Sequence, residues 1–117
     1  MNAVTLLLPY PPSTNRIWRY AKNRVYRSAE YKAWLAEGGE ALRKQAHETY
    51  TYPVSIEFRV GRPDRRRRDL DNTIKPTLDL LEAGNVLADD CLMHRMLALW
   101  VDDVTGIQVD IYPMGAQ

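Results

Sequence analysis

The sequence has 117 residues, of which 45% are hydrophobic and 26% are charged, and its net charge at neutral pH is +1. This length leaves no room for a second core, so we expect residues 1–117 to form a single domain. The longest apolar run, at residues 4–8, is too short to cross a bilayer, and no cleavable leader is evident, which favours the cytoplasm. A single cysteine, Cys91, excludes an internal disulfide. We expect Cys91 to be buried, and with two histidines a Cys and His zinc site is not expected.

The charges are divided unevenly along the chain. Up to Arg68 there are 14 Lys and Arg against 6 Asp and Glu, and from Asp69 onward there are 2 against 9. This asymmetry favours one surface that binds a polyanion and a separate acidic cluster with a different role. The alternative is that both sets are scattered over a solvated surface, and the asymmetry alone leaves it open.

The first residues predict a strand followed by a long loop. Residues 4–8 are suited to a short strand that Pro9 ends, and residues 9–15 form a proline-rich loop because proline lacks a backbone donor and fixes an extended geometry. Residues 24–27 are expected to be a second, short strand.

A helix is expected from Ser28 to about His47. Ser28 is a suitable N-cap, and the apolar spacing is helical. The face that this spacing predicts to be buried contains Tyr31, Trp34, Leu35, Gly38 and Leu42. The pair Gly38-Gly39 indicates either a bend in the helix or another part of the chain packed very close to it.

The second half predicts a strand, a helix and two more strands. Residues 54–60 alternate between apolar and polar side chains, as in a half-buried strand. A helix from about residue 71 to 83 is compatible with Pro76 only if Pro76 lies in its first turn, and residues 92–101 and 107–112 suit strands. The order predicts an α+β fold, a small mixed sheet with two main helices packed on one face.

Two aspartates at the predicted start of the second helix are the central candidates for chemistry. Asp69 and Asp71 can point to the same side of the turning chain, and Asp89-Asp90 follows later. Like charges held close together require a cation, and Mg²⁺ prefers hard oxygen ligands. Asp69, Asp71 and one of Asp89 and Asp90 would suit it. The alternative is that Asp69 and Asp71 cap the helix and that Asp89-Asp90 is a polar turn.

The four arginines Arg65, Arg66, Arg67 and Arg68 run directly into Asp69. A basic run beside two acids brings phosphate and metal to one place, as cleavage of a phosphodiester requires. The alternative is a solvated loop whose arginines form salt bridges with those same aspartates. Lys75, one turn past Asp71, can contact the scissile phosphate or form an i,i+4 salt bridge with Asp79.

The stretch after the proline-rich loop mixes basic residues with the aromatic residues Trp18 and Tyr20. Such a mixture suits distorted or unpaired nucleic acid, although Trp18 is better explained as a core residue. The residues expected to bind DNA here are Asn15, Arg16, Arg19, Lys22, Arg24 and Arg27.

The sequence resembles the RusA family of Holliday-junction resolvases over essentially its whole length. The resemblance lies in the loop at residues 8–16, the run at residues 63–72, Lys75 and Asp89-Asp90. It implies that Asp69, Asp71 and Asp90 are catalytic carboxylates that bind Mg²⁺, for which Mn²⁺ can substitute. Lys75 would be the catalytic basic residue close to the cleaved phosphate.

The same resemblance implies a homodimer that binds four-way DNA junctions and nicks two strands symmetrically, in a bacterial or phage-infected cell. A two-fold dimer matches the approximate two-fold symmetry of a junction. The alternatives are a non-catalytic nucleic-acid-binding module and a metal-dependent nuclease that acts on other branched DNA. A small phosphorylated substrate is not expected, since fourteen basic residues precede Asp69. A membrane partner is not expected either, because the longest apolar run is too short to cross a bilayer.

Overall fold

The computed structural model describes residues 2–13, 18–21, 24–45 and 47–114. The strands are β1 (Val4–Leu8), β2 (Trp18–Ala21), β3 (Arg24–Arg27), β4 (Val54–Gly61), β5 (Met93–Val101) and β6 (Ile107–Pro113). The α-helices are α1 (Ala29–Arg43) and α2 (Ile74–Ala83), and two short 3₁₀ helices are η2 (Leu70–Thr73) and η3 (Asp90–Leu92). None of the helices in these described ranges is long and apolar enough to cross a membrane.

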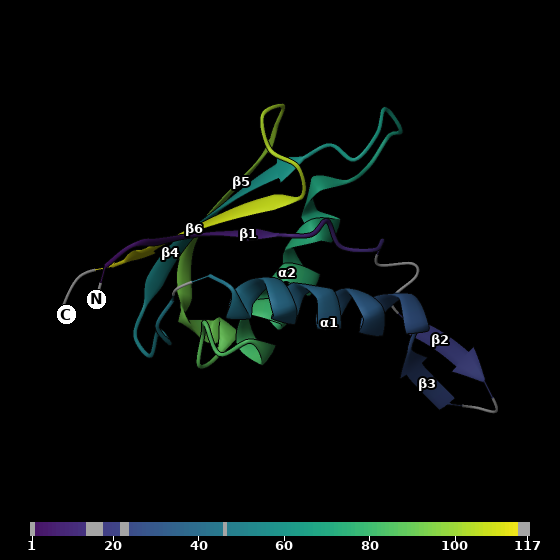
Figure 1. Ribbon diagram of the computed structural model, residues 1–117, viewed down its shortest axis with the longest axis horizontal. Helices are drawn as coiled ribbons and strands as arrows, with labels where there is room; N and C mark the ends of the chain where they lie inside the picture. Colours follow the sequence, from purple (N-terminus) through teal and green to yellow (C-terminus); the bar gives the residue numbers. More distant parts are fainter. Residues whose placement is uncertain (1, 14–17, 22–23, 46, 115–117) are drawn as a thin grey trace.

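The main sheet has four strands in the order β1-β6-β4-β5. β6 pairs antiparallel with both β1 and β4, whereas β4 and β5 are parallel because α2 crosses over between them. Figure 1 shows α1 and α2 on the same side of this sheet. The α+β fold with a mixed sheet and two helices is confirmed.

The alternating pattern of β4 places its apolar residues in the core. Ile56, Phe58 and Val60 are fully buried, while Glu57 and Arg59 face the opposite side of the sheet and stay partly exposed. β6 contributes Ile107, Val109 and Ile111 to the same core. Both strands are central in the sheet, and burial of these six side chains is the main apolar contribution of the sheet to the core.

Helix α1 begins as predicted but ends earlier. The Ser28 side chain accepts a hydrogen bond from the Tyr31 backbone N–H and caps the first turn. The helix stops at Arg43, four residues before the predicted end at His47. After it the chain turns back toward β1, where the Gln45 side chain bonds to the backbone of Leu7.

The glycine pair in α1 reflects close packing. A Cβ added to Gly38 would lie 2.4 Å from Cδ2 of Leu80, a buried residue of α2. At Gly39 the nearest atom would be Arg43 Nη1, 3.8 Å away. Gly38 therefore lets α1 and α2 approach each other, whereas Gly39 has open space beside it.

The predicted strand order is wrong in one detail. Between the proline-rich loop and the first helix one short strand was expected, at residues 24–27, but the structure has two, β2 and β3, which pair with each other and form a separate two-stranded sheet. Figure 1 shows this hairpin beyond the amino end of α1, at the end of the molecule opposite the chain termini. The cause is that a four-residue strand with mixed polarity carries too little periodicity to be predicted.

Candidate active site

The two candidate aspartates lie at the start of a 3₁₀ turn that leads into α2. Asp69 is the N-cap of η2 and Asp71 is in its first turn, and Pro76 is the third residue of α2, as its missing N–H requires. The Asp69 side chain makes no capping hydrogen bond, and both carboxylates are exposed. Within the described part of the chain neither has a hydrogen-bond or ion-pair partner, so the capping interpretation is not supported.

Asp64 organises the loop that contains Arg65, Arg66, Arg67 and Arg68, called the arginine loop below. Its carboxylate accepts hydrogen bonds from Arg66 Nε at 3.0 Å and from Arg68 Nη2 at 2.7 Å, and also from the Arg66 backbone N–H. The Arg68 hydrogen bond is the main cause that holds the pKa of Asp64 far below its ordinary value, and the same pair raises the pKa of Arg68. Arg66 and Arg68 therefore pair with Asp64, not with Asp69 and Asp71 as the alternative interpretation required.

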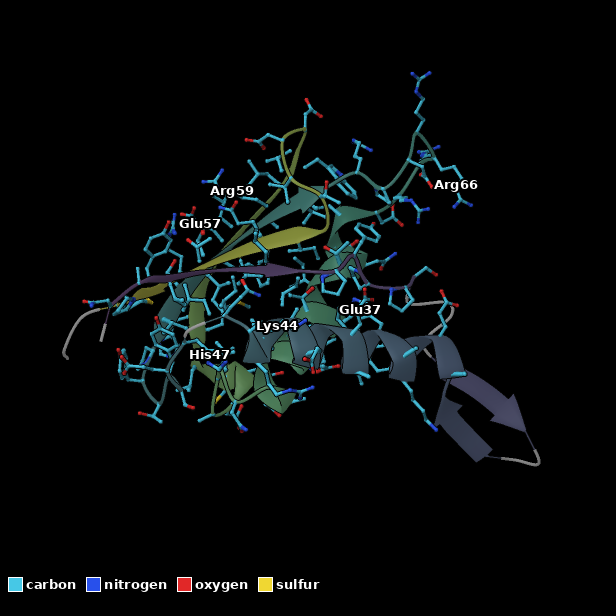
Figure 2. All side chains as sticks on the ribbon, viewed as in Figure 1. Glu37, Lys44, His47, Glu57, Arg59 and Arg66 are labelled. Atoms are coloured by element: carbon cyan, nitrogen blue, oxygen red, sulfur yellow. The ribbon has the colours of Figure 1, made fainter. Side chains whose placement is uncertain are left out.

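The proline-rich loop lies against this arginine loop. A pocket of about 200 Å³ is lined by residues 10–13, by Arg67, Arg68 and Asp69, and by the η2 residues Asn72 and Thr73. A second hollow of about 560 Å³ shares residues 10–13 and Arg68 and extends to Arg66 and α1. Figure 2 shows Arg66 on the loop that extends beyond the sheet. The fold thus joins two segments that lie over fifty residues apart in the sequence.

Lys75 connects α2 with the segment before β5. Its Nζ lies 3.0 Å from Asp79 Oδ1 and 3.0 Å from Asp90 Oδ2. The hydrogen bond with Asp90, followed by that with Asp79, raises the pKa of Lys75 above its ordinary value. The predicted salt bridge with Asp79 is confirmed, but it exists together with a contact to a candidate catalytic carboxylate.

The structure brings Asp90 close to other acids, but not to Asp69 and Asp71. Oxygen atoms of Glu82, Asp89 and Asp90 lie within 4.8 Å of one another, and among the residues described this is the one group of three acidic or Cys/His side chains that close. Each of these carboxylates also forms a hydrogen bond or an ion pair within the chain. Glu82 accepts from the Asp90 backbone N–H, Asp89 accepts from the Cys91 backbone N–H, and Asp90 pairs with Lys75.

Cys91 is exposed, contrary to the prediction that it is buried. It lies in η3, whose turn faces the solvent beside the acidic group. The hydrogen bond with the Asp89 side chain is the main cause that raises the pKa of its thiol above the ordinary value. A protonated thiol is a poor nucleophile and a poor metal ligand. The candidate metal ligands of this region are therefore its carboxylates, not Cys91.

The other predicted DNA contacts are placed only in part. Arg65 and Arg67 are exposed on the arginine loop. In the hairpin register, Arg19 pairs with Tyr26, Trp18 with Arg27, and Ala21 with Arg24. Asn15, Arg16 and Lys22, and the side chains of β2 and β3, including Trp18, lie outside what the structure describes.

Sequence patterns missed Asp64 and Glu82 as partners within this region. The spacing of Asp64 to Arg66 and Arg68 was visible in the sequence, but it competed with the shorter spacing from Arg68 to Asp69. Glu82 and Asp90 are eight residues apart on either side of a turn, and no local pattern pairs them.

The family model described as Endodeoxyribonuclease RusA matches residues 9–112 of the chain. The chain belongs to the RusA family. It is 32% identical over 118 residues to the crossover junction endodeoxyribonuclease RusA of Escherichia coli strain K12, covering 98% of each chain. It shows the same identity and coverage with the enzymes named crossover junction endodeoxyribonuclease RusA of Shigella sonnei and Enterobacteria phage 82.

Membership in the RusA family confirms the resemblance predicted from the sequence. The matched range includes the arginine loop, η2, Lys75 and the acidic group before β5. Because RusA proteins are endodeoxyribonucleases, the endonuclease prediction is favoured over a non-catalytic nucleic-acid-binding module.

Proposed function

We propose that this RusA-family chain is a structure-selective endonuclease that resolves four-way DNA junctions by paired symmetric nicks during recombination and repair. Residues 1–117 would act as one domain. The observation that carries the proposal is the pair of exposed, unpaired carboxylates, Asp69 and Asp71, directly after an arginine loop held in place by Asp64. The relatives that the chain matches over nearly its full length are named for cleavage at crossover junctions.

The arginine loop would bind the phosphate backbone. Asp64 orients Arg66 and Arg68, whereas Arg65 and Arg67 are exposed and available for phosphate oxygens. Phosphate contacts position a nucleic acid without reading its sequence, as a structure-selective enzyme requires. The basic residues of the hairpin, Arg19, Arg24 and Arg27, with Asn15, Arg16 and Lys22, would extend this surface along a DNA arm.

Asp69, Asp71 and Asp90 would hold a divalent ion, Mg²⁺ or its substitute Mn²⁺. When bound, such an ion lowers the pKa of a water and offsets the charge on the reacting phosphate. Exposed carboxylate oxygens without internal partners fit a hard cation, and Asp69 and Asp71 meet this requirement. Asp90 also offers carboxylate oxygens of the kind that Mg²⁺ prefers, although one of them forms an ion pair with Lys75.

Two protomers would complete this ligand set. Within one chain Asp90 is grouped with Glu82 and Asp89, and Asp69 and Asp71 are not members of that group. β4 and β5 are parallel, and the aspartates of η2 follow the carboxyl end of β4 while Asp90 precedes the amino end of β5. A homodimer in which one protomer supplies Asp90 and its partner supplies Asp69 and Asp71 accounts for this separation.

Lys75 would hold a positive charge where the scissile phosphate binds. Its ammonium is exposed, and the hydrogen bonds with Asp90 and Asp79 raise its pKa further above the ordinary value of a lysine, so it stays protonated. A fixed cation beside the reacting phosphate stabilises the charge that builds up in the transition state.

Cleavage of a synthetic four-way junction in the presence of Mg²⁺ tests the proposal. The wild-type protein should give paired symmetric nicks on a denaturing gel. The D71N variant should lose cleavage but retain binding, since a carboxylate that repels phosphate has been neutralised. The matched control E82Q removes one acid from the group around Asp90 and should keep most activity. Loss of cleavage in E82Q with full activity in D71N would place the metal in the other acidic group.

Mixed dimers test the shared site. D71N and D90N protomers, each inactive alone, should regain cleavage of one strand when mixed, because one of the two composite sites then holds every ligand. Sites contained in single chains would give no activity in the mixture. Preferential cleavage of flaps or forks over junctions would instead support a nuclease for other branched DNA.

A further inference from the structure

An arginine lies over a tryptophan ring where the two parallel strands end. Cζ of Arg62 is 4.6 Å from the centroid of the Trp100 ring, a distance typical of a cation–π contact. Arg62 is the first residue after β4, and Trp100 pairs with Val60 in the register of β4 and β5. The pair therefore lies at the carboxyl ends of both strands, on the segment that leads into the arginine loop.

The Trp100 ring is the contact that positions the Arg62 guanidinium. Among the residues that the structure describes, this guanidinium forms no hydrogen bond and no ion pair, and Arg62 is exposed. Arg68 differs, because its guanidinium lies 5.8 Å from the centroid of Tyr10 and also pairs with Asp64. The Arg62 guanidinium is therefore available to a ligand at a place that an aromatic ring determines.

Trp100 gives this contact a fixed support. Its ring is partly buried and packs against the hydrophobic core, so the core determines where the ring lies. Tryptophan also has the largest aromatic surface of any side chain and is the most favourable ring for a cation. Arg62 is thus presented to the solvent from a strand of the main sheet.

The Arg62–Trp100 pair lies in the same region as the candidate active site. β5 contacts η2, whose first turn contains Asp71. Tyr10, which lines the pocket beside Asp69, is also near Arg62. Burial raises the pKa of Tyr10, and the positive charges of Arg68 and Arg62 partly offset this rise. Two aromatic rings, each with an arginine over it, therefore border the proposed metal ligands.

Arginine and aromatic surfaces of this kind recognise exposed nucleobases. Within a continuous duplex each base is covered on both faces by its neighbours and offers no free face. At the branch point of a four-way junction this stacking is interrupted, and a flanking base can expose one face. Proteins bind such faces with aromatic rings and with guanidinium groups, and the contact tolerates any base sequence. The Arg62–Trp100 pair has the chemistry that this contact requires.

We propose that the Arg62–Trp100 pair stacks on a base that flanks the branch point of a four-way junction. The inference rests on the proposed function and adds to it a contact that plain duplex cannot make. The arginine loop supplies phosphate contacts, which any DNA offers, whereas this pair distinguishes an exposed base from a stacked one. Because the chain runs from Arg62 through the arginine loop to Asp69, one segment would hold both the exposed base and the phosphate to be cut.

Removal of one base at the branch point tests the contact directly. The D71N background is used so that binding is measured without cleavage. An abasic site is placed next to the branch point on each strand in turn, and the dissociation constant is measured at each position. Loss of the stacked base should raise the dissociation constant by about 10-fold or more at the position that the pair contacts. An abasic site in the middle of an arm is the matched control and should have no effect.

The R62K variant separates stacking from phosphate binding. Lysine keeps the charge that a phosphate needs but lacks the planar group that a base needs. In the D71N background, R62K should bind the intact junction about 10-fold more weakly, become insensitive to the abasic site and keep its affinity for plain duplex. R43K makes the same exchange at the carboxyl end of α1 and should change none of these. Equal sensitivity to the abasic site with and without R62K would overturn the proposal.

Two substitutions of Trp100 test the supporting ring. W100F keeps an aromatic ring and should retain most of the junction affinity, whereas W100L should resemble R62K, and urea unfolding checks that both are folded. Undiminished sensitivity to the abasic site in a folded but less stable W100L would assign Trp100 a purely structural role and overturn the proposal. Wild-type protein that nicks junctions while no abasic site affects binding would refute the stacking contact and leave the nuclease proposal intact. Sensitivity to the abasic site without any cleavage by the wild type would refute the nuclease proposal alone.

Discussion

Nζ of Lys75 lies 3.0 Å from Oδ2 of Asp90, and the same ammonium lies 3.0 Å from Oδ1 of Asp79. One lysine thus holds a helix residue and the first residue of η3 together. The lysine also neutralises Asp90, which the proposed function assigns to the metal. If Asp90 held a divalent ion, the Lys75 ammonium would be available to contact the phosphate.

Replacement of Lys75 by methionine should reduce junction nicking without unfolding the protein. Loss of a charge that stabilises the transition state typically lowers kcat by about 10²- to 10³-fold. The ion pairs are exposed, so the free energy of unfolding should change by less than about 1 kcal/mol. Single-turnover cleavage and urea unfolding measure these effects. The control K44M removes the same charge from the exposed carboxyl end of α1, and equal activity in K75M and K44M would contradict the role.

Replacement of Asp64 by asparagine should weaken discrimination between junctions and plain duplex. Arg66 and Arg68 lose their shared partner and become free to contact phosphates on any DNA. The affinity for duplex DNA should rise. The slope of log affinity against log salt concentration should steepen by the amount expected for about one to two additional phosphate contacts. Filter binding over a range of salt concentrations measures this, with the exposed-site variant E48Q as the charge-matched control. An unchanged salt slope would show that both arginines already contact phosphate in the wild type.

The same variant should change how stability responds to acid. Hydrogen bonds from Arg68 and Arg66 lower the pKa of Asp64 below its ordinary value of 3.8. A lowered pKa in the folded state stabilises the protein above 3.8, and the contribution is lost as the pH falls toward the folded pKa. In D64N the melting temperature should therefore fall less between about pH 5 and pH 2 than in the wild type. Parallel curves for the two proteins would show that the ion pairs do not affect folding.

The two adjacent glycines of α1 should respond in opposite ways to alanine. G38A forces a methyl group against Leu80, and overpacking of this kind costs about 1–3 kcal/mol, which exceeds the helix-propensity gain of about 1 kcal/mol. G39A meets no atom closer than 3.8 Å and should stabilise the protein by up to about 1 kcal/mol. Urea unfolding of both variants measures the difference. Equal stabilisation would mean that α1 and α2 can separate without cost.

Replacement of Gln45 by alanine should open the β1 edge. Both hydrogen bonds to the Leu7 backbone are lost, at a cost of about 1–2 kcal/mol. The newly exposed edge should also produce assemblies larger than a dimer in sedimentation. Q45E keeps the acceptor but not the donor and should give an intermediate effect. Unchanged sedimentation in Q45A would show that another feature protects this edge.

Patterns within the sequence were sufficient to predict the elements that carry local signals. Ser28 caps α1 as predicted, the alternation at residues 54–60 produces β4, and Pro76 lies in the first turn of α2. The arginine loop beside Asp69 and Asp71 was also evident from residue order, and it led to the correct family. These features depend on neighbours within a few residues, where capping, periodicity and the missing N–H of proline act directly.

Only the tertiary structure decided which charged groups meet. Arg66 and Arg68 pair with Asp64, and Asp90 pairs with Lys75 fifteen residues earlier. The insertion of β6 between β1 and β4, which makes β5 an edge strand, is likewise not encoded in any one segment. Such contacts depend on how distant elements pack, because the free energy of one ion pair or strand pairing is determined by burial and geometry that the whole fold supplies.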